Sequence, residues 1–291
     1  MSSPNPEATG LLTNRRLLWV GVTVYLLLVF GVMLWRGISI EPQWVVLALL
    51  LVAVALGRGR AFITDWLPFL VLFFAYEVMR GFAPKAGFAA HDISGWERVV
   101  FAGQLPTVVL QQQFYNPAVI SIQDWVSMVL YFLHFPLPIV VGFVFWLNDR
   151  SHYWQFISAL LLMSFVAFVT YLFFPSQPPW YANAHEVHKV INETIQKWGV
   201  AYFVSPFYTS LNPNKFAAFP SLHAAFPAIS AIYAWKRYRV LALGLTAYSL
   251  LVWLAIVYLG EHYFIDALAG LAYAGAATAV VAAATRARRA S

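Results

Sequence analysis

Residues 240–259 read VLALGLTAYSLLVWLAIVYL, twenty positions without a charged side chain. A helix of about 20 apolar residues spans the roughly 30 Å hydrocarbon core of a bilayer, so this stretch predicts a membrane span. The chain of 291 residues is 61% hydrophobic and only 10% charged, whereas soluble domains average about 25% charged residues. We therefore expect an all-α, polytopic membrane protein and exclude a soluble enzyme.

Seven further apolar runs predict about eight spans in a transmembrane helix bundle. These runs are Leu17–Trp35, Trp44–Leu56, Ala61–Met79, Trp125–Leu147, Tyr153–Phe174, Phe219–Trp235 and Tyr263–Ala284. The first run is as long as a full span and is followed by Trp35-Arg36 instead of a small-residue cleavage site. We therefore interpret it as a retained anchor rather than a signal peptide.

Two long connections, 81–123 and 175–217, interrupt the spans, and no soluble domain fits in either. We expect residues 1–60 to form a tail and two additional membrane helices, and residues 61–291 to form a six-helix core. Near 93–100 and 187–198 within the connections, apolar residues fall on one face of a helix and charged residues on the opposite face. These patterns predict short helices that either lie on the membrane surface or pack on the bundle.

The basic residues predict the orientation in the membrane. With the N-terminus inside, eleven of the 18 Lys and Arg residues lie on the inner side, mostly in short segments such as 235–239 and 286–289. Short basic segments beside a membrane resist translocation. We therefore expect an integral protein of the plasma or inner membrane, with both termini cytoplasmic and both long connections outside. This topology accounts for the net charge of +6, so we expect no nucleic-acid partner.

Two histidines occupy comparable places at the outer ends of neighbouring spans. Between His223 and His262 the chain makes two passes joined by a basic inner turn, so it returns to the side it left. Each histidine stands at the start of an apolar helix, where backbone N–H groups and the helix dipole favour an anion. The two helix starts together predict a pocket of phosphate size.

Asp266 follows His262 by four residues, so on a helix the two side chains share a face. The carboxylate can then accept a hydrogen bond from one ring nitrogen, which fixes the tautomer and makes the other nitrogen a better nucleophile or base. The alternative is a purely structural pair, in which the histidine only offsets the cost of burying the aspartate charge at a helix end. The second histidine on the same side favours a catalytic site.

These motifs resemble a known family. The sequences PSLH at 220–223 and GEHYFID at 260–266 resemble the second and third motifs of the type 2 phosphatidic acid phosphatase superfamily. Within it, they are most similar to the branch that contains inositol phosphorylceramide synthases and sphingomyelin synthases. The sequences PPW at 178–180 and YEVMR at 76–80, and Asp124 with Tyr131 and His134, are also similar to that branch. The likeness covers about residues 61–284.

The resemblance implies a reaction that needs no metal and no cofactor. His262 would attack phosphorus and form a phosphohistidine, Asp266 would orient and stabilise it, and His223 would protonate the leaving oxygen. An acceptor hydroxyl would then take the phosphoryl group. Water as the acceptor makes the enzyme a phosphatase, and an alcohol makes it a transferase.

The sequence departs from the phosphatases of that superfamily in its basic residues. The phosphatases typically carry Lys, six residues and Arg-Pro in the first motif, and an Arg before the third-motif histidine. Here residues 175–180 contain no basic side chain, and Glu261 stands before His262. A phosphodiester brings less charge than a monoester, so this weaker cationic site favours a diester donor, although Lys215 and Arg80 can restore some positive charge.

The leading hypothesis is a phosphotransferase that moves an inositol phosphate-like headgroup from a phospholipid diester to a lipid alcohol. The candidate substrate-binding residues are Ser221, Lys215, Arg80, Glu261, Trp180 and His134. Glu261 can instead be a surface carboxylate, and His134 can be hydrogen-bonded between helices. The alternatives are a lipid phosphate or polyprenyl pyrophosphate phosphatase, and a non-enzymatic transporter whose buried charges, such as Asp65, line a path. The oligomeric state stays open.

Overall fold

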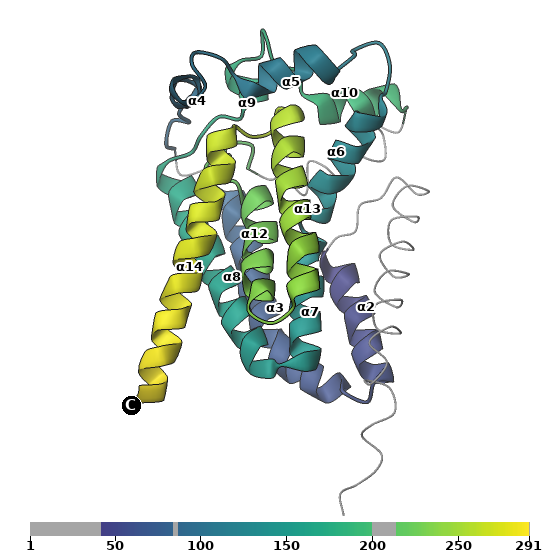
Figure 1. Cartoon of the computed structure of the whole chain (residues 1–291), viewed down its shortest axis with the longest axis vertical. Helices are drawn as coiled ribbons and strands as arrows, with labels where there is room; N and C mark the ends of the chain where they lie inside the picture. The colour runs from purple at the N-terminus through teal and green to yellow at the C-terminus, as the bar shows by residue number, and fades with distance from the viewer. Residues whose placement is uncertain (1–41, 84–86, 200–213, 291) are drawn as a thin grey trace, which may run out of the picture. The chain divides into compact units, whose positions relative to one another are not determined.

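The computed structural model describes residues 42–83, 87–199 and 214–290, which belong to one compact unit, Glu41–Ser291. These ranges contain twelve α-helices and no β-strand, as the hydropathy pattern predicts (Figure 1). The predicted first span, Leu17–Trp35, lies outside the described residues.

Three described helices are long and apolar enough to cross a membrane: α8 (Arg150–Phe173), α13 (Arg239–Tyr258) and α14 (Phe264–Ala290). Shorter or more polar helices complete the bundle: α2 (Pro42–Ala55), α3 (Gly59–Phe82) and α12 (Leu222–Trp235). A bent pair, α6 and α7, brings the number of candidate spans in this part of the chain to four. The chain is therefore an integral membrane protein, and the full number of spans stays a prediction.

The expected single span Trp125–Leu147 needs correction. The structure divides it into α6 (Ile122–Leu133) and α7 (Pro136–Asn148), which are bent by 50° relative to each other. The cause is Pro136, which lacks a backbone N–H and whose ring clashes with the preceding helical turn. His134 lies at the break, as the C-terminal cap of α6.

Helix α12 lies at the centre of the bundle and packs against α7, α8, α13 and α14 (Figure 1). Its sequence, LHAAFPAISAIYAW, is rich in small residues, which allow neighbouring helix backbones to approach closely. The closest approach is at Gly270 of α14, where an added Cβ would lie 2.4 Å from the Ser221 carbonyl oxygen. This contact joins the starts of α12 and α14.

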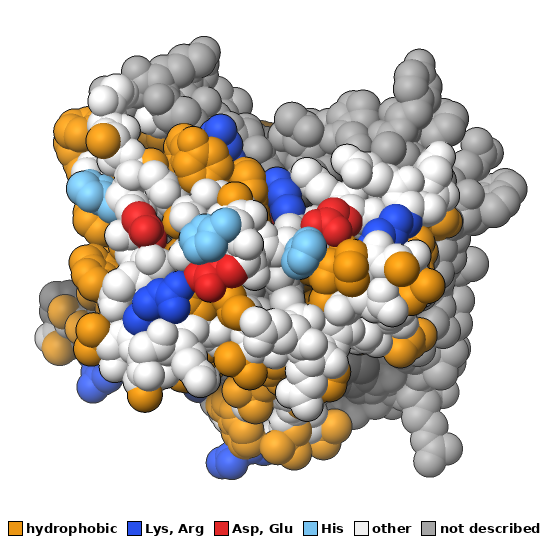
Figure 2. All heavy atoms as spheres, turned by 90° about the horizontal axis from the view of Figure 1, so that it is seen from above, with side chains coloured by type: hydrophobic (Ala, Val, Ile, Leu, Met, Phe, Trp, Pro, Cys, Tyr) orange, Lys and Arg blue, Asp and Glu red, His pale blue; other side chains and the backbone are white. Residues whose placement is uncertain are grey.

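The two long connections form short helices at one end of the bundle: α4 (Ser94–Val100), α5 (Pro106–Phe114), α9 (Pro179–Ala182) and α10 (Val190–Lys197) (Figure 1). Helix α10 packs on α6 and buries its apolar face. Of the two predicted alternatives for this segment, a helix packed on the bundle is therefore confirmed. Helix α4 also contacts α14, although its Val99 side chain is 83% exposed. Figure 2 shows acidic, basic and histidine side chains close together on this end.

We predict that Gly270→Ala destabilises the bundle, because the methyl group meets a backbone oxygen that cannot move without shifting α12. Overpacking of this kind costs about 1–3 kcal/mol. Thermal unfolding of the purified protein in detergent measures the effect. The matched control is Gly275→Ala on the same helix, where an added Cβ meets nothing within 4 Å. An equal unfolding temperature for both variants would contradict the prediction.

Candidate active site

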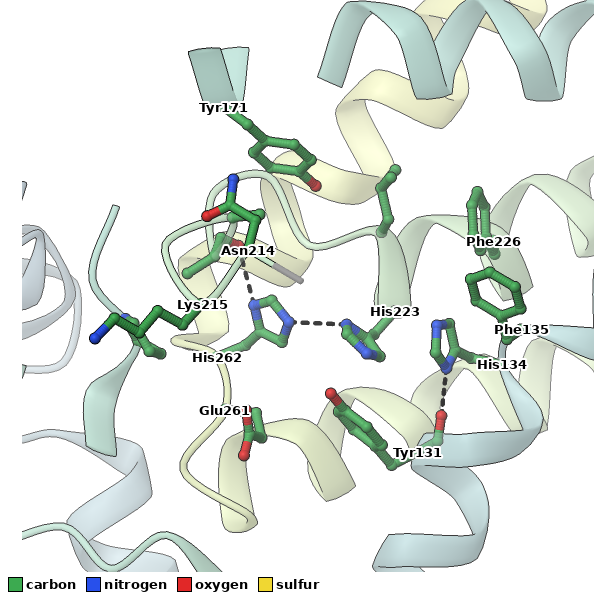
Figure 3. A pocket seen from close by; sticks show the side chains of 14 residues that line it. Tyr131, His134, Phe135, Tyr171, Asn214, Lys215, His223, Phe226, Glu261 and His262 are labelled. Atoms are coloured by element: carbon green, nitrogen blue, oxygen red, sulfur yellow. Dashed lines mark hydrogen bonds between the residues drawn. The ribbon is translucent and has the colours of Figure 1, made fainter. Parts of the chain in front are cut away.

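The two histidines lie in one narrow pocket below the loop helices. Its walls come from the start of α12, the turn before α14, the α6–α7 break and the segment 214–218 (Figure 3). The lining residues are Tyr131, His134, Phe135, Tyr171, Pro178, Asn214, Lys215, Ala217, Ala218, Leu222, His223, Phe226, Glu261 and His262. The cavity measures about 30 Å³, which is room for a water molecule, so a larger ligand must displace side chains at its rim.

His262 and His223 are in direct contact. His262 Nε2 lies 2.9 Å from His223 Nδ1, and His262 Nδ1 lies 3.0 Å from the carbonyl oxygen of Ala218. A carbonyl oxygen can only accept, so His262 carries a proton on Nδ1, and in the neutral ring Nε2 has a lone pair. In that form of the ring, the Nδ1–H of His223 donates to the lone pair. The basic nitrogen of a neutral His262 then faces a protonated nitrogen of His223.

The structure changes the expected partner of His262 Nδ1. Asp266 Oδ2 lies 3.4 Å away, close enough for an ion pair with a charged ring, but the hydrogen bond goes to Ala218. The reason is that His262 precedes α14 instead of lying on it, and Asp266 Oδ2 accepts the N–H of Tyr263 at 2.8 Å. The Asp266 side chain is fully buried, and its Oδ1 has no hydrogen-bond partner among the described residues.

The expected anion site at the start of α14 also needs correction, because protein carboxylates already occupy it. Glu97 of α4 accepts the N–H of Phe264 at 2.8 Å and of Ile265 at 3.0 Å, and its side chain is completely buried. Burial raises the pKa of Glu97, while these two hydrogen bonds act in the opposite direction. Sequence reasoning missed Glu97 because a Glu on an amphipathic loop helix usually faces water.

Of the candidate substrate-binding residues, the structure places some in the pocket and others outside it. His134, Lys215 and Glu261 line the pocket. Ser221 lies beside it and caps α12, its hydroxyl accepting the N–H of Ala224 at 3.3 Å. Trp180 lies outside the lining, with the Lys189 ammonium 3.8 Å from its ring centre. The side chain of Arg80 lies outside the described residues.

His134 belongs to the cavity and is bonded within its own helix. Its Nδ1 contacts the Tyr131 carbonyl oxygen one turn earlier, and its ring centre lies 4.0 Å from that of His223. Tyr131 stacks on His223 at 4.3 Å. The end of α6 therefore places the rings of Tyr131 and His134 against His223. The sequence indicates only His134 as a site residue.

A family model described as the PAP2 superfamily matches residues 94–280, which include Glu97 and both histidines. The chain belongs to the PAP2 superfamily. It is 28% identical over 227 residues, 72% of each chain, to phosphoinositol dihydroceramide synthase from Bacteroides thetaiotaomicron. It is also 28% identical to the inositol phosphorylceramide synthase catalytic subunit aur1 of Schizosaccharomyces pombe, over 61% of this chain and 43% of the relative.

A further relative is a PA-phosphatase related-family protein from Dictyostelium discoideum, 28% identical over 40% of this chain and 21% of that protein. No solved structure matches the chain. The chain is therefore an enzyme, either a phosphotransferase or a phosphatase, because it belongs to the PAP2 superfamily and is similar to proteins named as synthases.

Glu261 places a buried acidic side chain in the candidate site. Its side chain is only 4% exposed, so the alternative of a water-facing carboxylate is wrong. Lys189 interacts electrostatically with Glu261 and with Lys215. Burial lowers the pKa of the Lys189 ammonium, and the nearby Glu261 carboxylate counteracts this effect. The sequence alone placed Lys189 on the polar face of a loop helix, and no local signal connected it with the site.

Within the described ranges, no three His, Asp or Glu side chains lie together in an arrangement that could hold a metal ion. That the reaction needs neither metal nor cofactor stays a prediction.

We predict that Glu97→Gln destabilises the protein and lowers its activity. The amide keeps one acceptor oxygen but turns an N–H₂ group toward a buried backbone N–H, and an unsatisfied buried group costs about 1–3 kcal/mol. Thermal unfolding and turnover measure the two effects. Glu186→Gln is the control, because Glu186 pairs with Arg98 near the surface, where an ion pair contributes at most about 1 kcal/mol. Equal stability of the two variants would rule out the capping role.

Proposed function

We propose that this enzyme transfers a phosphorylated polar headgroup, inositol phosphate-like, from a phospholipid diester to a lipid alcohol. The observation that carries the proposal is the 2.9 Å contact between His262 and His223 in a buried pocket. The names of the bacterial and yeast relatives, which are synthases of inositol phosphate-bearing ceramides, support the choice of headgroup and acceptor.

In the first step, the Nε2 lone pair of His262 attacks the phosphorus of the donor. The bond from phosphorus to the glyceride oxygen breaks, and His223, acting as an imidazolium, gives its Nδ1 proton to that oxygen, so the diglyceride leaves as an alcohol and His223 becomes neutral. The headgroup phosphate is then bound to a ring that keeps its proton on Nδ1. Asp266, 3.4 Å from that nitrogen, stabilises the resulting positive charge.

In the second step, the hydroxyl of the lipid alcohol gives its proton to the now neutral His223. Its oxygen attacks phosphorus, the bond to His262 breaks, and the headgroup leaves on the new lipid. His223 is protonated again and His262 has regained its lone pair, so the enzyme returns to its starting state.

The charges around the pocket favour a diester donor. A phosphomonoester with nearly two negative charges calls for Arg-type bidentate partners, and a buried carboxylate beside the reacting histidine opposes it. A diester carries one negative charge and tolerates this neighbour better. Glu261 can also accept hydrogen bonds from the hydroxyl groups of a polyol headgroup. Ser221, Lys215, Arg80, Trp180 and His134 complete the proposed substrate-binding residues.

We also propose the topology that the basic residues predict, with about eight spans, cytoplasmic termini, a catalytic core of 61–291 and an active site on the outer side. The arrangement of the helices supports it. The pocket lies at the end with the loop helices, whereas the α12–α13 turn, with Lys236 and Arg237, and the C-terminal end of α14 lie at the other end (Figure 1). Basic segments are retained on the cytoplasmic side.

A phosphatase is the second candidate, and the small cavity favours it, because about 30 Å³ beside the histidines admits water as the acceptor. The transporter hypothesis finds no support in Asp65. This buried carboxylate is ion-paired with Arg150 and accepts the Trp146 indole N–H at 2.8 Å, so it is satisfied within the protein.

The test is to trap the intermediate. Protein incubated with phosphatidylinositol labelled in its phosphate, without acceptor, is expected to carry the label on His262, and a lipid alcohol is expected to remove it as a new lipid. His262→Ala should carry no label, and His223→Ala should form it about 10²–10⁴ times more slowly, the usual effect of a general acid.

His185→Ala is the control, because this loop histidine is 79% exposed. Release of inorganic phosphate from monoesters, with no headgroup transferred to any lipid alcohol, would decide for the phosphatase.

A further inference from the structure

The two reacting histidines are oriented by different kinds of contact. His262 is held by a hydrogen bond, since its Nδ1 lies 3.0 Å from the Ala218 carbonyl oxygen. His223 lies against the face of Tyr131, with 4.3 Å between the ring centres and 25° between the ring planes. The His134 ring is tilted by 42° against His223, so Tyr131 provides the flatter stack.

The stack and the contact with His262 use different parts of the His223 ring. Figure 3 shows the Tyr131 ring below His223, while the Nδ1 edge of His223 faces His262. His223 is only partly buried, so its ring could turn away from His262 if nothing packed against its face. The stack with Tyr131 opposes that rotation.

A contact with the ring face suits a histidine that transfers protons. Both imidazole nitrogens lie in the ring plane, so a partner above that plane orients the ring without occupying either nitrogen. A hydrogen bond to His223 Nδ1 from another side chain would instead compete with the transfer. A cation is attracted to the face of a tyrosine ring, so the stack also tolerates the imidazolium that the first step requires.

Tyr131 is itself held firmly, because helix α6 is fixed along α13. The Tyr131 side chain is only 3% exposed, and it lies seven residues after the buried Asp124, on the same face of α6. Near the start of α6, the hydroxyl of Tyr258 donates to Asp124. Near its end, the hydroxyl of Tyr248 donates to the Leu130 carbonyl at 2.8 Å. These two bonds from α13 fix the position of the Tyr131 ring.

The geometry points to Tyr131 as a positioning residue, whose ring holds His223 so that its Nδ1 proton is aimed at the leaving oxygen. This inference rests on the proposed function in that His223 is the general acid of the first step. Tyr131 makes and breaks no bond: the proton passes from His223 Nδ1 to the oxygen as the bond between that oxygen and phosphorus breaks. Reacting groups keep their productive geometry when packing locks their rotamers.

The test compares two donors that leave the same group on His262. One is phosphatidylinositol, whose alkoxide must be protonated as it leaves, and the other is a p-nitrophenyl ester of inositol phosphate, whose p-nitrophenolate leaves without a proton. Both are labelled in the phosphate, and the rate of labelling of His262 is measured at saturating donor. A residue that acts through the acid matters for the first donor only.

We expect Tyr131→Leu to slow labelling from phosphatidylinositol by about 10–100-fold, a part of the roughly 10²–10⁴-fold effect of a general acid. Labelling from the p-nitrophenyl ester should change little. Tyr131→Phe keeps the ring and should restore most of the lost rate. The ratio of the two rates in one preparation does not depend on the fraction of protein that is folded, so a loss of stability cannot imitate this result.

Tyr153→Leu is the matched control. Tyr153, near the start of α8, is also a buried tyrosine stacked on another ring, that of Trp66, at 5.3 Å. We expect this variant to lower the unfolding temperature and to leave the ratio of the two labelling rates as in the wild type. His223→Ala gives the reference for a lost acid, with slow labelling from phosphatidylinositol only.

Equal slowing with both donors in Tyr131→Leu would overturn the inference, because it would show a purely structural role. Wild-type labelling from phosphatidylinositol in that variant would also overturn it. So would a Tyr131→Phe variant as slow as Tyr131→Leu, since the hydroxyl and not the ring would then matter.

Failure of the proposed function gives a different result. If the wild-type enzyme is labelled by phosphomonoesters only, headgroup transfer fails, and an alkyl and a p-nitrophenyl monoester then test Tyr131 in the same way. If His223→Ala slows both donors equally, His223 is not the general acid, and the inference fails with it. If headgroups are transferred and only the Tyr131 variants depart from expectation, the role of Tyr131 alone fails.

Discussion

The distance between the two histidines depends on a backbone contact between the starts of α12 and α14. The N–H of Ser221 donates to the carbonyl of Asp266 at 3.0 Å. Gly270 allows this approach, since a side chain there would meet the Ser221 carbonyl. His223 follows one of these joined segments and His262 precedes the other. The contact of 2.9 Å between their rings is therefore fixed by main-chain geometry, which positions catalytic groups more rigidly than long side chains do.

A consequence of this joint is that α14 begins in a buried place and needs its own acceptors. Glu97 and Asp266 together take the N–H groups of Tyr263, Phe264 and Ile265. Two carboxylates thus occupy the positive end of the α14 dipole, and little of that potential is left for a substrate phosphate. The attraction for phosphate then falls to the start of α12, to the His223 proton and to the proposed substrate-binding residues. Such a site suits a ligand with a single negative charge.

Hydropathy predicted the membrane helices well because α8, α13 and α14 are long uninterrupted apolar runs. It also predicted that two passes return His262 to His223, because that result follows from topology alone. The break at Pro136 was missed because hydropathy takes no account of a missing backbone N–H. Glu97 and the Ala218 carbonyl were missed for another reason: their roles arise from tertiary contacts, and nothing in their neighbouring sequence indicates them.

The two groups near His262 Nδ1 serve different stages of the proposed reaction. The Ala218 carbonyl is neutral and holds the ring proton before the reaction begins. Asp266 lies 3.4 Å away, and its carboxylate would interact most strongly with this ring once the ring becomes a phosphohistidine cation. An interaction that strengthens after the ground state raises kcat instead of merely tightening substrate binding. This explains why a fully buried carboxylate beside the histidine is useful although the resting hydrogen bond goes elsewhere.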